Sequence, residues 1–213
     1  MKNREVWSRH YESEKSNLEI PDENVVRFLN KYFQKQNNQI RALDLGSGSG
    51  RHSRYLQKFN AQVYSYDFSH NILAKMYATD SLDIENSNGA NKSAGICGVA
   101  ESLPFKSNSF DLILSWGVLH YLTRDAVSQS ISEIYRVLKK KGEILATIRS
   151  DKDTHLSSVL KTGDLKEGIA LLYSYKDAIN LFSKFKNIEY GFISRQPIGD
   201  EKIVAHHIFK AQK

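Results

Sequence analysis

Three glycines at alternate positions are the residues of this chain with the clearest chemical use. Gly46, Gly48 and Gly50 follow an apolar stretch at residues 42–45 and precede a helix-compatible segment, 51–59. Glycine lets the backbone turn sharply and approach a ligand more closely than any side chain would permit. The spacing differs from the G-x-G-x-x-G pattern that receives a pyrophosphate at a helix N-terminus. The sequence therefore predicts a strand-turn-helix that binds a nucleotide cofactor without phosphates.

An acidic residue ends the next expected strand, residues 62–66. Rossmann-like sites place an acid about 20 residues beyond their glycine loop, where its carboxylate accepts the ribose hydroxyls. Asp67 stands at about that separation, and Asp44 lies near the end of the preceding strand. The pattern predicts that two acidic strand ends flank one crevice.

Five short motifs in a fixed order make the interpretation more specific. They are Asp44-x-Gly46-x-Gly48-x-Gly50, Asp67-Phe68-Ser69, Ala100-Glu101-x-Leu103-Pro104-Phe105, Ser109-Phe110-Asp111 and Val137-Leu138-Lys139-x-x-Gly142-Glu143. Together they resemble the class I S-adenosylmethionine-dependent methyltransferases, in particular the small type 11 branch. The resemblance covers residues 40–149, and the agreement of five motifs is far more specific than one glycine loop.

The resemblance implies S-adenosylmethionine as the cofactor and assigns residues to its parts. Gly46, Ser47 and Gly48 would line the methionine and ribose portion, and Asp67 would accept both ribose hydroxyls. Ala100 would meet an adenine nitrogen through its backbone amide. The full implied set of cofactor residues is Tyr11, Asp44, Gly46, Ser47, Gly48, Gly50, Asp67, Phe68, Ala100, Glu101, Ser115 and Trp116.

Alternatives remain for several of these residues. Asp44 would orient the cofactor's amino group through water, or it would merely cap a turn. Phe68 would pack on the adenine edge, or it would belong to the core. Tyr11, together with Trp7, resembles an aromatic lid before the first helix, and these rings either seal a core edge or touch the cofactor. Many relatives carry Asp where this chain has Val99, and valine cannot accept a hydrogen bond from the adenine amino group.

Methyl transfer requires alignment of the acceptor atom with the sulfonium carbon, and an alcohol acceptor must also lose its proton. His120, after the fourth expected strand, is the candidate base, with a structural role as the alternative; His155 is a weaker candidate. His206 and His207 alternate along an expected strand and would point to opposite faces. Histidines and the lone cysteine do not occur with ligand spacing, so no metal site is expected.

The expected elements alternate along the chain. Strands are predicted at 40–45, 62–66, 96–99, 112–115 and 143–148, and helices at 23–33, from 51, at 70–78 and at 126–138. Residues 80–92 are predicted as a loop. The final segments, 187–194 and 202–209, resemble the antiparallel hairpin that closes the class I methyltransferase sheet. The expected fold is therefore α/β: a Rossmann-like, seven-stranded, mostly parallel sheet with a terminal antiparallel hairpin and helices on both faces.

The chain is expected to form a single methyltransferase domain over residues 1–213. Residues 1–35 would form an N-terminal lid and helix, 40–149 the cofactor-binding core, and 150–213 an acceptor cap with the terminal hairpin. Its 213 residues suffice for one sizeable core.

No run of 18 apolar residues and no signal peptide is recognised, so a cytoplasmic protein without membrane contact is expected.

Cys97 is the only cysteine and is predicted to be buried. The net charge is +6, but the basic residues are spread along the chain. The densest run, Lys139-Lys140-Lys141, is read as a solvated turn, with an RNA-binding footprint as the alternative.

A small-molecule acceptor, such as a sugar or another hydroxyl compound, is the favoured partner. Aromatic residues expected near the acceptor entrance suit a planar or ring-shaped molecule; they are Trp116, Tyr121, Tyr173 and Tyr175. Two alternatives stay open: a methyltransferase that modifies transfer RNA, and a non-catalytic regulator that only binds S-adenosylmethionine. The oligomeric state is not indicated.

Overall fold

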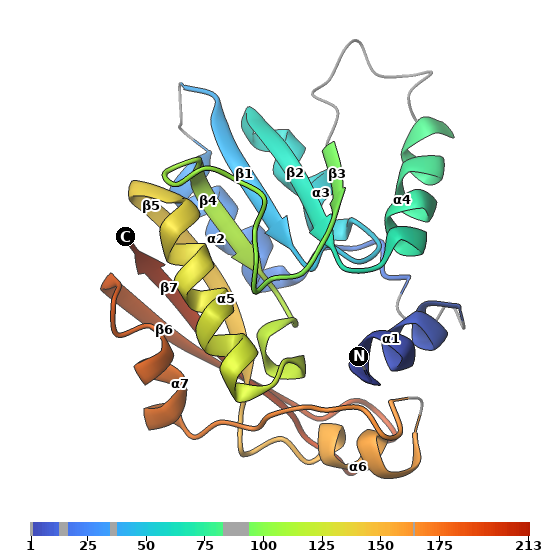
Figure 1. Cartoon of the computed structure of the whole chain (residues 1–213). Coiled ribbons are helices and arrows are strands. Elements are labelled where there is room, and N and C mark those ends of the chain that lie inside the picture. Colours follow the sequence, from blue (N-terminus) through green and yellow to red (C-terminus); the bar gives the residue numbers. More distant parts are fainter. Residues whose placement is uncertain (1, 13–16, 35–37, 83–93, 164) are drawn as a thin grey trace.

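The structure is a computed structural model that describes residues 2–12, 17–34, 38–82, 94–163 and 165–213. Within these residues, seven strands form one sheet in the order β3-β2-β1-β4-β5-β7-β6 (Figure 1). Their bounds are β1 Ile40–Leu45, β2 Ala61–Asp67, β3 Ala94–Cys97, β4 Phe110–Ser115, β5 Leu138–Arg149, β6 Lys186–Arg195 and β7 Val204–Gln212. The helices are α1 Lys2–Glu12, α2 Glu23–Phe33, α3 Arg51–Leu56, α4 His70–Leu82, α5 Arg124–Val137, α6 His155–Thr162 and α7 Tyr175–Leu181. Short 3-10 turns lie at η1 Gln57–Phe59 and η3 Leu119–Tyr121.

The sheet is mostly parallel. Strands β1, β2, β3, β4 and β5 pair in parallel, whereas β7 runs antiparallel to both β5 and β6. This arrangement confirms the predicted mostly parallel sheet with a terminal antiparallel hairpin. Parallel neighbours bring their carboxyl ends to one edge, so the loops after β1, β2 and β4 lie close together. In Figure 1, α1 and α6 lie at that edge.

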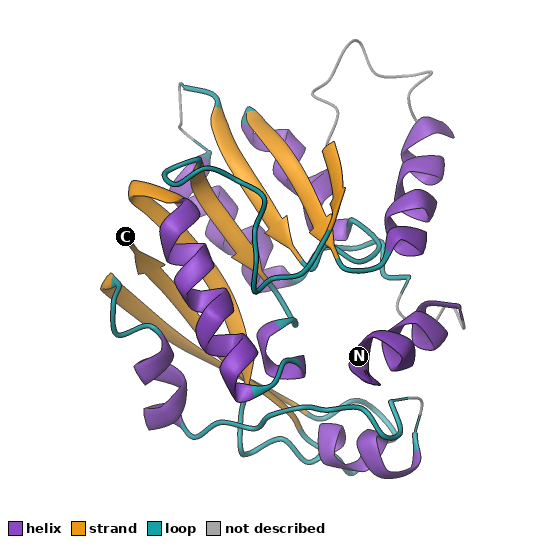
Figure 2. Ribbon diagram, viewed as in Figure 1, coloured by secondary structure: helices purple, strands orange, loops and turns teal. Residues whose placement is uncertain are grey.

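Helices cover both faces of the sheet because alternate strand residues point to opposite sides. Leu43 and Leu45 of β1 belong to a core that also contains Val127 and Ile134 of α5 and Ala178 of α7. Ala42 of β1 and Leu112 and Leu114 of β4 instead join a second core with Val25 and Leu29 of α2 and Leu56 of α3. The two layers of helix are visible on either side of the strands in Figure 2. The α/β class predicted from the sequence is therefore confirmed.

Helix α2 begins where the sequence indicated. The carboxylate of Asp22 caps the helix by accepting a hydrogen bond from the Asn24 backbone amide at 3.0 Å. This contact satisfies one of the amides that have no partner within a helix.

None of the helices in the described part of the chain combines the length and the apolar composition that a membrane span requires.

Several element boundaries differ from the prediction. Strand β5 begins at Leu138 and contains the lysine run, which is therefore not a simple turn; a positive φ of 67° at Lys141 accompanies a register shift against β4. Helix α4 continues to Leu82, into the segment predicted as a loop, and residues 83–92 of that segment lie outside the described residues. Helices α1, α6 and α7 were not predicted. Strand β7 extends to Gln212, beyond the predicted end.

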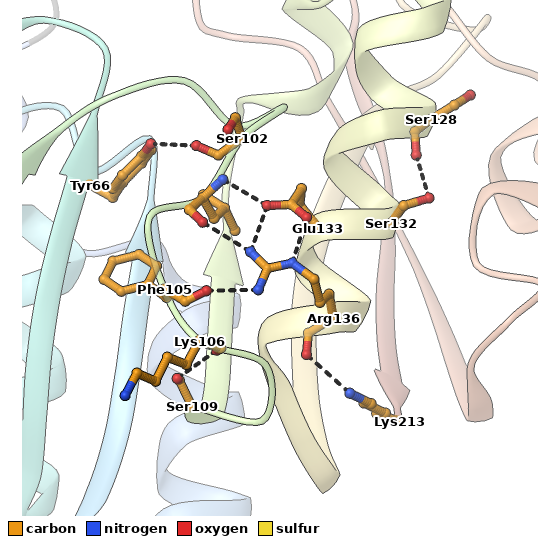
Figure 3. Close-up of polar contacts among 11 residues, drawn as sticks. Tyr66, Ser102, Phe105, Lys106, Ser109, Ser128, Ser132, Glu133, Arg136 and Lys213 are labelled. Carbon is orange, nitrogen blue, oxygen red and sulfur yellow. Dashed lines mark hydrogen bonds and ion pairs between the residues drawn. The ribbon is translucent and has the colours of Figure 1, made fainter.

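Helix α5 anchors the loop that follows β3. Glu133 accepts a hydrogen bond from the Leu103 amide at 2.8 Å. The Arg136 guanidinium donates to the carbonyl oxygens of Leu103 at 2.9 Å and Phe105 at 2.7 Å, and to Glu133 (Figure 3). On the other side of the loop, the Tyr66 hydroxyl donates to the carbonyl of Val99 at 3.1 Å. The segment carrying Ala100 and Glu101 is thus fixed from both sides.

We expect Arg136→Met to destabilise the fold by about 1–2 kcal/mol, because two loop carbonyls and Glu133 lose a charged donor. The free energy of unfolding from urea titration measures this effect. Arg27→Met is the matched control: its pair with Glu23 joins side chains that are 77% and 72% exposed, so its cost should stay below about 0.5 kcal/mol. Equal effects of the two substitutions would contradict the anchoring role.

Candidate functional site

The turn after β1 requires glycine. Gly46 has a φ of 74°, and a Cβ atom there would lie 2.1 Å from Cγ2 of Val118. Its amide donates to the Tyr66 carbonyl at 2.7 Å, as does the Ser47 amide at 3.1 Å. The loop therefore folds back onto the end of β2, and its position cannot be kept with a side chain at residue 46.

Asp67 joins the glycine loop to the end of β2. Its carboxylate accepts a hydrogen bond from the Gly48 amide at 3.0 Å and another from the Ser69 amide at 2.9 Å. The residue is only 2% exposed. Burial raises the pKa of Asp67, and the hydrogen bonds from Ser69, Gly48 and Phe68 oppose that rise. The carboxylate is thus a fixed acceptor at the wall of the crevice.

Asp44 lies behind the loop in a buried chain of hydroxyl groups. The Ser53 hydroxyl donates to Asp44 at 2.7 Å, and the Ser65 hydroxyl donates to Ser53 at 2.7 Å. Burial raises the pKa of Asp44 to about 6; the Ser53 hydrogen bond lowers it, and the charge of Asp67 raises it further. Asp44 therefore combines with Asp67 to make the region beneath the glycine loop electronegative.

A first cavity of about 140 Å³ opens between the strand ends and α1. The predicted residues Tyr11, Gly46, Asp67, Phe68, Ala100 and Glu101 all line it. Val99 lines it as well. The structure thus brings the glycine loop, the acid after β2 and the Ala100-Glu101 loop to one cavity, as their strand-end positions indicated.

A second cavity of about 280 Å³ adjoins the first. The two share the walls formed by Trp7, Tyr11, Gly46, Gly117 and Tyr121. The predicted residues Ser47, Gly48 and Trp116 line the second cavity. Its remaining walls include side chains that the sequence analysis did not assign to a site, namely Asp22, Arg51, His52, Arg149, Arg195 and His206.

Some predicted residues face neither cavity. Asp44 and Ser115 are buried, at 1% and 0% exposure. Gly50 precedes α3 with a φ of 81°, and a Cβ atom there would lie 2.3 Å from the Met76 sulfur, so it has a packing reason to be glycine. Tyr173 is buried at 4% exposure, and Tyr175 packs on Tyr190 with ring centroids 4.7 Å apart. Neither tyrosine lines the cavities, contrary to the expectation for the acceptor entrance.

His120 lies in the core and does not face the cavities. It is 1% exposed, its ring lies tilted against that of Tyr121 with centroids 4.3 Å apart, and neither ring nitrogen has a hydrogen-bond partner among the described residues. Burial and the nearby His206 and Arg149 hold its pKa well below the usual range. A base role for His120 therefore has no direct path to an acceptor in this arrangement.

Two other histidines face the second cavity. His206 accepts through Nε2 from the Arg149 guanidinium at 3.0 Å, and His52 accepts through Nε2 from the Asp22 amide at 3.2 Å. Because Arg and amide groups only donate, these contacts assign the ring proton of the neutral imidazole to Nδ1 in each case. Burial lowers the pKa of His206 to about 4 and that of His52 to about 3, with nearby arginines contributing. His207 points to the other face, as predicted, and its Nε2 lies 3.0 Å from the Tyr173 carbonyl.

Helix α1 holds the aromatic side chains that close both cavities. Trp7 packs edge-on against Tyr121 with ring centroids 4.7 Å apart, and it lies 5.6 Å from the Tyr11 ring. Val6, on the same helix, packs in a small cluster with Leu156 and Leu165. Trp7 and Tyr11 therefore pack against the neighbouring segment and also line the cavities, and their contact with the cofactor stays a prediction.

The prediction that Cys97 is buried was wrong. Cys97 is exposed at the end of β3, and its Sγ donates to the Phe68 carbonyl at 3.3 Å. Strand β3 is an edge strand of the sheet, and its short apolar sequence does not reveal that position.

Comparison with known proteins places this architecture in context. Residues 43–146 match the family model described as Methyltransferase domain. The bifunctional biotin biosynthesis protein BioHC of Cellvibrio japonicus is 33% identical over 111 residues, which are 52% of this chain and 20% of that protein. The chain matches between 20% and 49% of the length of its curated relatives.

Solved structures share the fold. The 1,6-didemethyltoxoflavin-N1-methyltransferase of Burkholderia thailandensis, solved with 1,6-didemethyltoxoflavin and S-adenosylhomocysteine, superposes with a TM-score of 0.73. It is 15% identical, and the match covers 100% of this chain and 86% of that one. A methyltransferase-like protein of Bacillus halodurans matches with a TM-score of 0.66 at 14% identity, covering 90% of this chain and 99% of that one.

We expect Asp44→Asn to change the pH dependence of stability in the ligand-free protein. Because the folded pKa of about 6 exceeds the ordinary value of 3.8 for an unfolded chain, the favourable contribution of Asp44 is complete below the unfolded pKa and is lost as pH rises through 6. Asparagine cannot ionise and still accepts from Ser53. The variant should therefore gain about 1–1.5 kcal/mol relative to the native protein between pH 5 and pH 8.

Urea unfolding of both proteins at the two pH values measures this difference. Ser128→Ala, an exposed change on α5, controls for general effects of pH on the assay. A difference between the Asp44→Asn and native proteins that does not change with pH would show that Asp44 is not a buried, titrating carboxyl.

Proposed function

Because this chain belongs to the class I S-adenosylmethionine-dependent methyltransferases, we propose that it transfers a methyl group from S-adenosylmethionine to a small-molecule acceptor. The observation that carries the proposal is the pair of adjoining cavities at the carboxyl ends of β1, β2 and β4. One has the glycine loop and the acid that the cofactor requires. The other offers space beyond the loop for a second reactant. We expect the reaction to take place in the cytoplasm.

The first cavity suits the adenosine part of the cofactor. In this proposal Asp67 accepts the ribose hydroxyls with the lone pairs that Gly48 and Ser69 leave available, in charge-assisted hydrogen bonds. The adenine lies between Phe68 and Val99, and the Ala100 amide donates to a ring nitrogen. Val99 contributes packing only, so adenine recognition depends on backbone groups and on Glu101.

The methionine part would then extend along Ser47 and Gly48 into the second cavity. The sulfonium and ammonium groups are positive, and the two buried acids, Asp44 and Asp67, provide a complementary potential beneath the loop. No ordered side chain needs to move a proton for the methyl group itself to transfer. The acceptor atom donates an electron pair to the methyl carbon, and the carbon–sulfur bond breaks with its electrons on sulfur. A hydroxyl acceptor passes its proton to water, whereas an anionic oxygen such as a carboxylate has no proton to lose.

The protein's main contribution to such a displacement is alignment and exclusion of water. Trp7 and Tyr11 of α1 cover the junction of the two cavities, and Trp116 and Tyr121 form further walls. These aromatic walls favour a planar or ring-shaped acceptor. Oxygen is the target atom that we favour. With His120 buried in the core, His206 is the histidine at the cavity wall, and its Nδ1–H is available to hold an acceptor oxygen in place.

Two alternatives lead to different measurements. Transfer RNA as acceptor would require phosphate contacts beside the cavities. The lysine run lies at the beginning of β5, whereas Arg149 at the end of that strand lines the second cavity, so the run is at the opposite edge of the sheet. A non-catalytic binder would retain cofactor affinity without turnover. Formation of S-adenosylhomocysteine in the presence of small hydroxyl and carboxyl compounds supports an enzyme; cofactor binding with no product for any acceptor class would favour the regulator.

We expect Asp67→Ala to weaken binding of S-adenosylhomocysteine by at least about 1.5 kcal/mol, because a buried, charge-assisted hydrogen bond is lost. Isothermal titration calorimetry measures the affinity, and a thermal melt confirms that the variant is folded. Asp125→Ala, which removes an exposed acid on α5, should bind as the native protein does. Unchanged affinity in a folded Asp67→Ala variant would exclude Asp67 from the cofactor site.

A further inference from the structure

The second cavity has an unusual concentration of positive charge. Three arginines line it: Arg51 at the start of α3, Arg149 at the end of β5 and Arg195 at the end of β6. The acidic side chain among its lining residues is Asp22. These residues are far apart in the sequence, and the sheet order brings them to one wall.

Arg149 is neutralised within the fold. Its Nε lies 2.6 Å from the Asp153 carboxylate, and both side chains are buried. The same carboxylate accepts from the backbone amides of Leu156 at 2.6 Å and Ala205 at 2.7 Å. Arg149 also holds His206. This buried arginine, paired with Asp153, is part of the permanent wall and is not available to balance a ligand's charge.

Arg51 and Arg195 differ from Arg149. Within the described part of the chain, neither forms an ion pair with a carboxylate, and Arg51 Nη1 donates only to the Ile20 carbonyl, at 3.2 Å. Asp22 already accepts hydrogen bonds from the amide and the side chain of Asn24. Burial lowers the pKa of Arg51, the charges of Asp22 and Asp44 raise it, and the charge of Arg195 lowers it, so the two guanidinium groups lie close enough to repel each other.

We propose that the second cavity binds its ligand through an anionic oxyacid group, a carboxylate or a phosphate, held between Arg51 and Arg195. The planar guanidinium fork donates two parallel hydrogen bonds to either group. An anion there also removes the repulsion between the two arginines. The apolar body of the ligand then packs on Trp116 and Tyr121. Identifying this ligand as the methyl acceptor rests on the proposed function; the anion site itself does not.

The carboxylate of the cofactor is the competing occupant of the same arginines. It can be separated from the acceptor by measuring each ligand alone. If Arg195 binds the acceptor, substitution of Arg195 leaves the affinity for S-adenosylhomocysteine unchanged. If it binds the cofactor, that affinity falls.

The chain offers a direct reporter for the second cavity. Its two tryptophans, Trp7 and Trp116, both line that cavity, so intrinsic fluorescence responds to occupancy. The protein, saturated with S-adenosylhomocysteine, is titrated with benzoate, with phenyl phosphate and with neutral benzamide. At least one of the two anions should bind at least tenfold more tightly than benzamide. The preferred anion identifies the oxyacid group.

Arg195→Gln should abolish the preference for the anion, because one of the two guanidinium groups that hold it is removed. The exposed Arg195 side chain makes no hydrogen bond or ion pair within the described residues, so its removal does not disturb the fold. Arg124→Gln, which removes an exposed charge on α5, should keep the preference. Equal binding of benzamide and both anions to the native protein would overturn the proposal, as would loss of S-adenosylhomocysteine affinity in Arg195→Gln. If the native protein does not bind S-adenosylhomocysteine, the proposed function fails, and titration of the free protein still tests the anion site.

Discussion

The carboxylate of Asp67 is the contact on which the geometry of the crevice depends. It accepts hydrogen bonds from Gly48 in the loop after β1 and from Ser69 after β2, so it ties two strand ends together. The Gly46 amide reinforces the junction by donating to Tyr66. Two adjacent parallel strands can bring their loops this close only because their carboxyl ends share one edge. A third loop, which carries Ala100, is added to the same edge by the Glu133–Arg136 pair of α5.

The charges around the cavities are unevenly distributed. Asp44 and Asp67 are buried beneath the glycine loop, and each would be more stable with a positive group nearby. Among the walls of the second cavity, Arg51 is partly balanced by the charges of Asp22 and Asp44 but is repelled by Arg195, and an anion beside these two arginines would stabilise them. A cofactor with a positive centre would stabilise the two buried carboxylates, and a ligand with a negative end would stabilise the two guanidinium groups. The fold of the sheet imposes these unfavourable charges on the site.

Motif spacing predicted which strand ends meet at the first cavity. Asp67 ends a strand, Gly46 and Ala100 each follow one closely, and parallel strands bring such residues to one edge whatever the lengths of the intervening segments. The walls of the second cavity could not be predicted in this way. Arg149 and Arg195 come from the ends of β5 and β6, and their approach to Arg51 depends on the insertion of β7 between those strands. The burial of His120 likewise depends on packing against His206, which lies far away in the sequence.

The position of helix α1 also could not be predicted from the local sequence pattern. Its sequence has few apolar residues, and the position of Trp7 and Tyr11 is determined by contacts with Tyr121 and with the Leu156 and Leu165 cluster. Exposure of Cys97 was missed for a related reason, since a short apolar strand reads the same at the edge of a sheet as at its centre.

A crystal structure with S-adenosylhomocysteine tests the central claim most directly. The account predicts that both ribose hydroxyls lie within hydrogen-bond distance of the Asp67 carboxylate. It also predicts that the adenine occupies the first cavity beside Phe68 and Val99, with the sulfur facing the second cavity. A ligand bound with its adenine in the second cavity, or without contact to Asp67, would contradict the account.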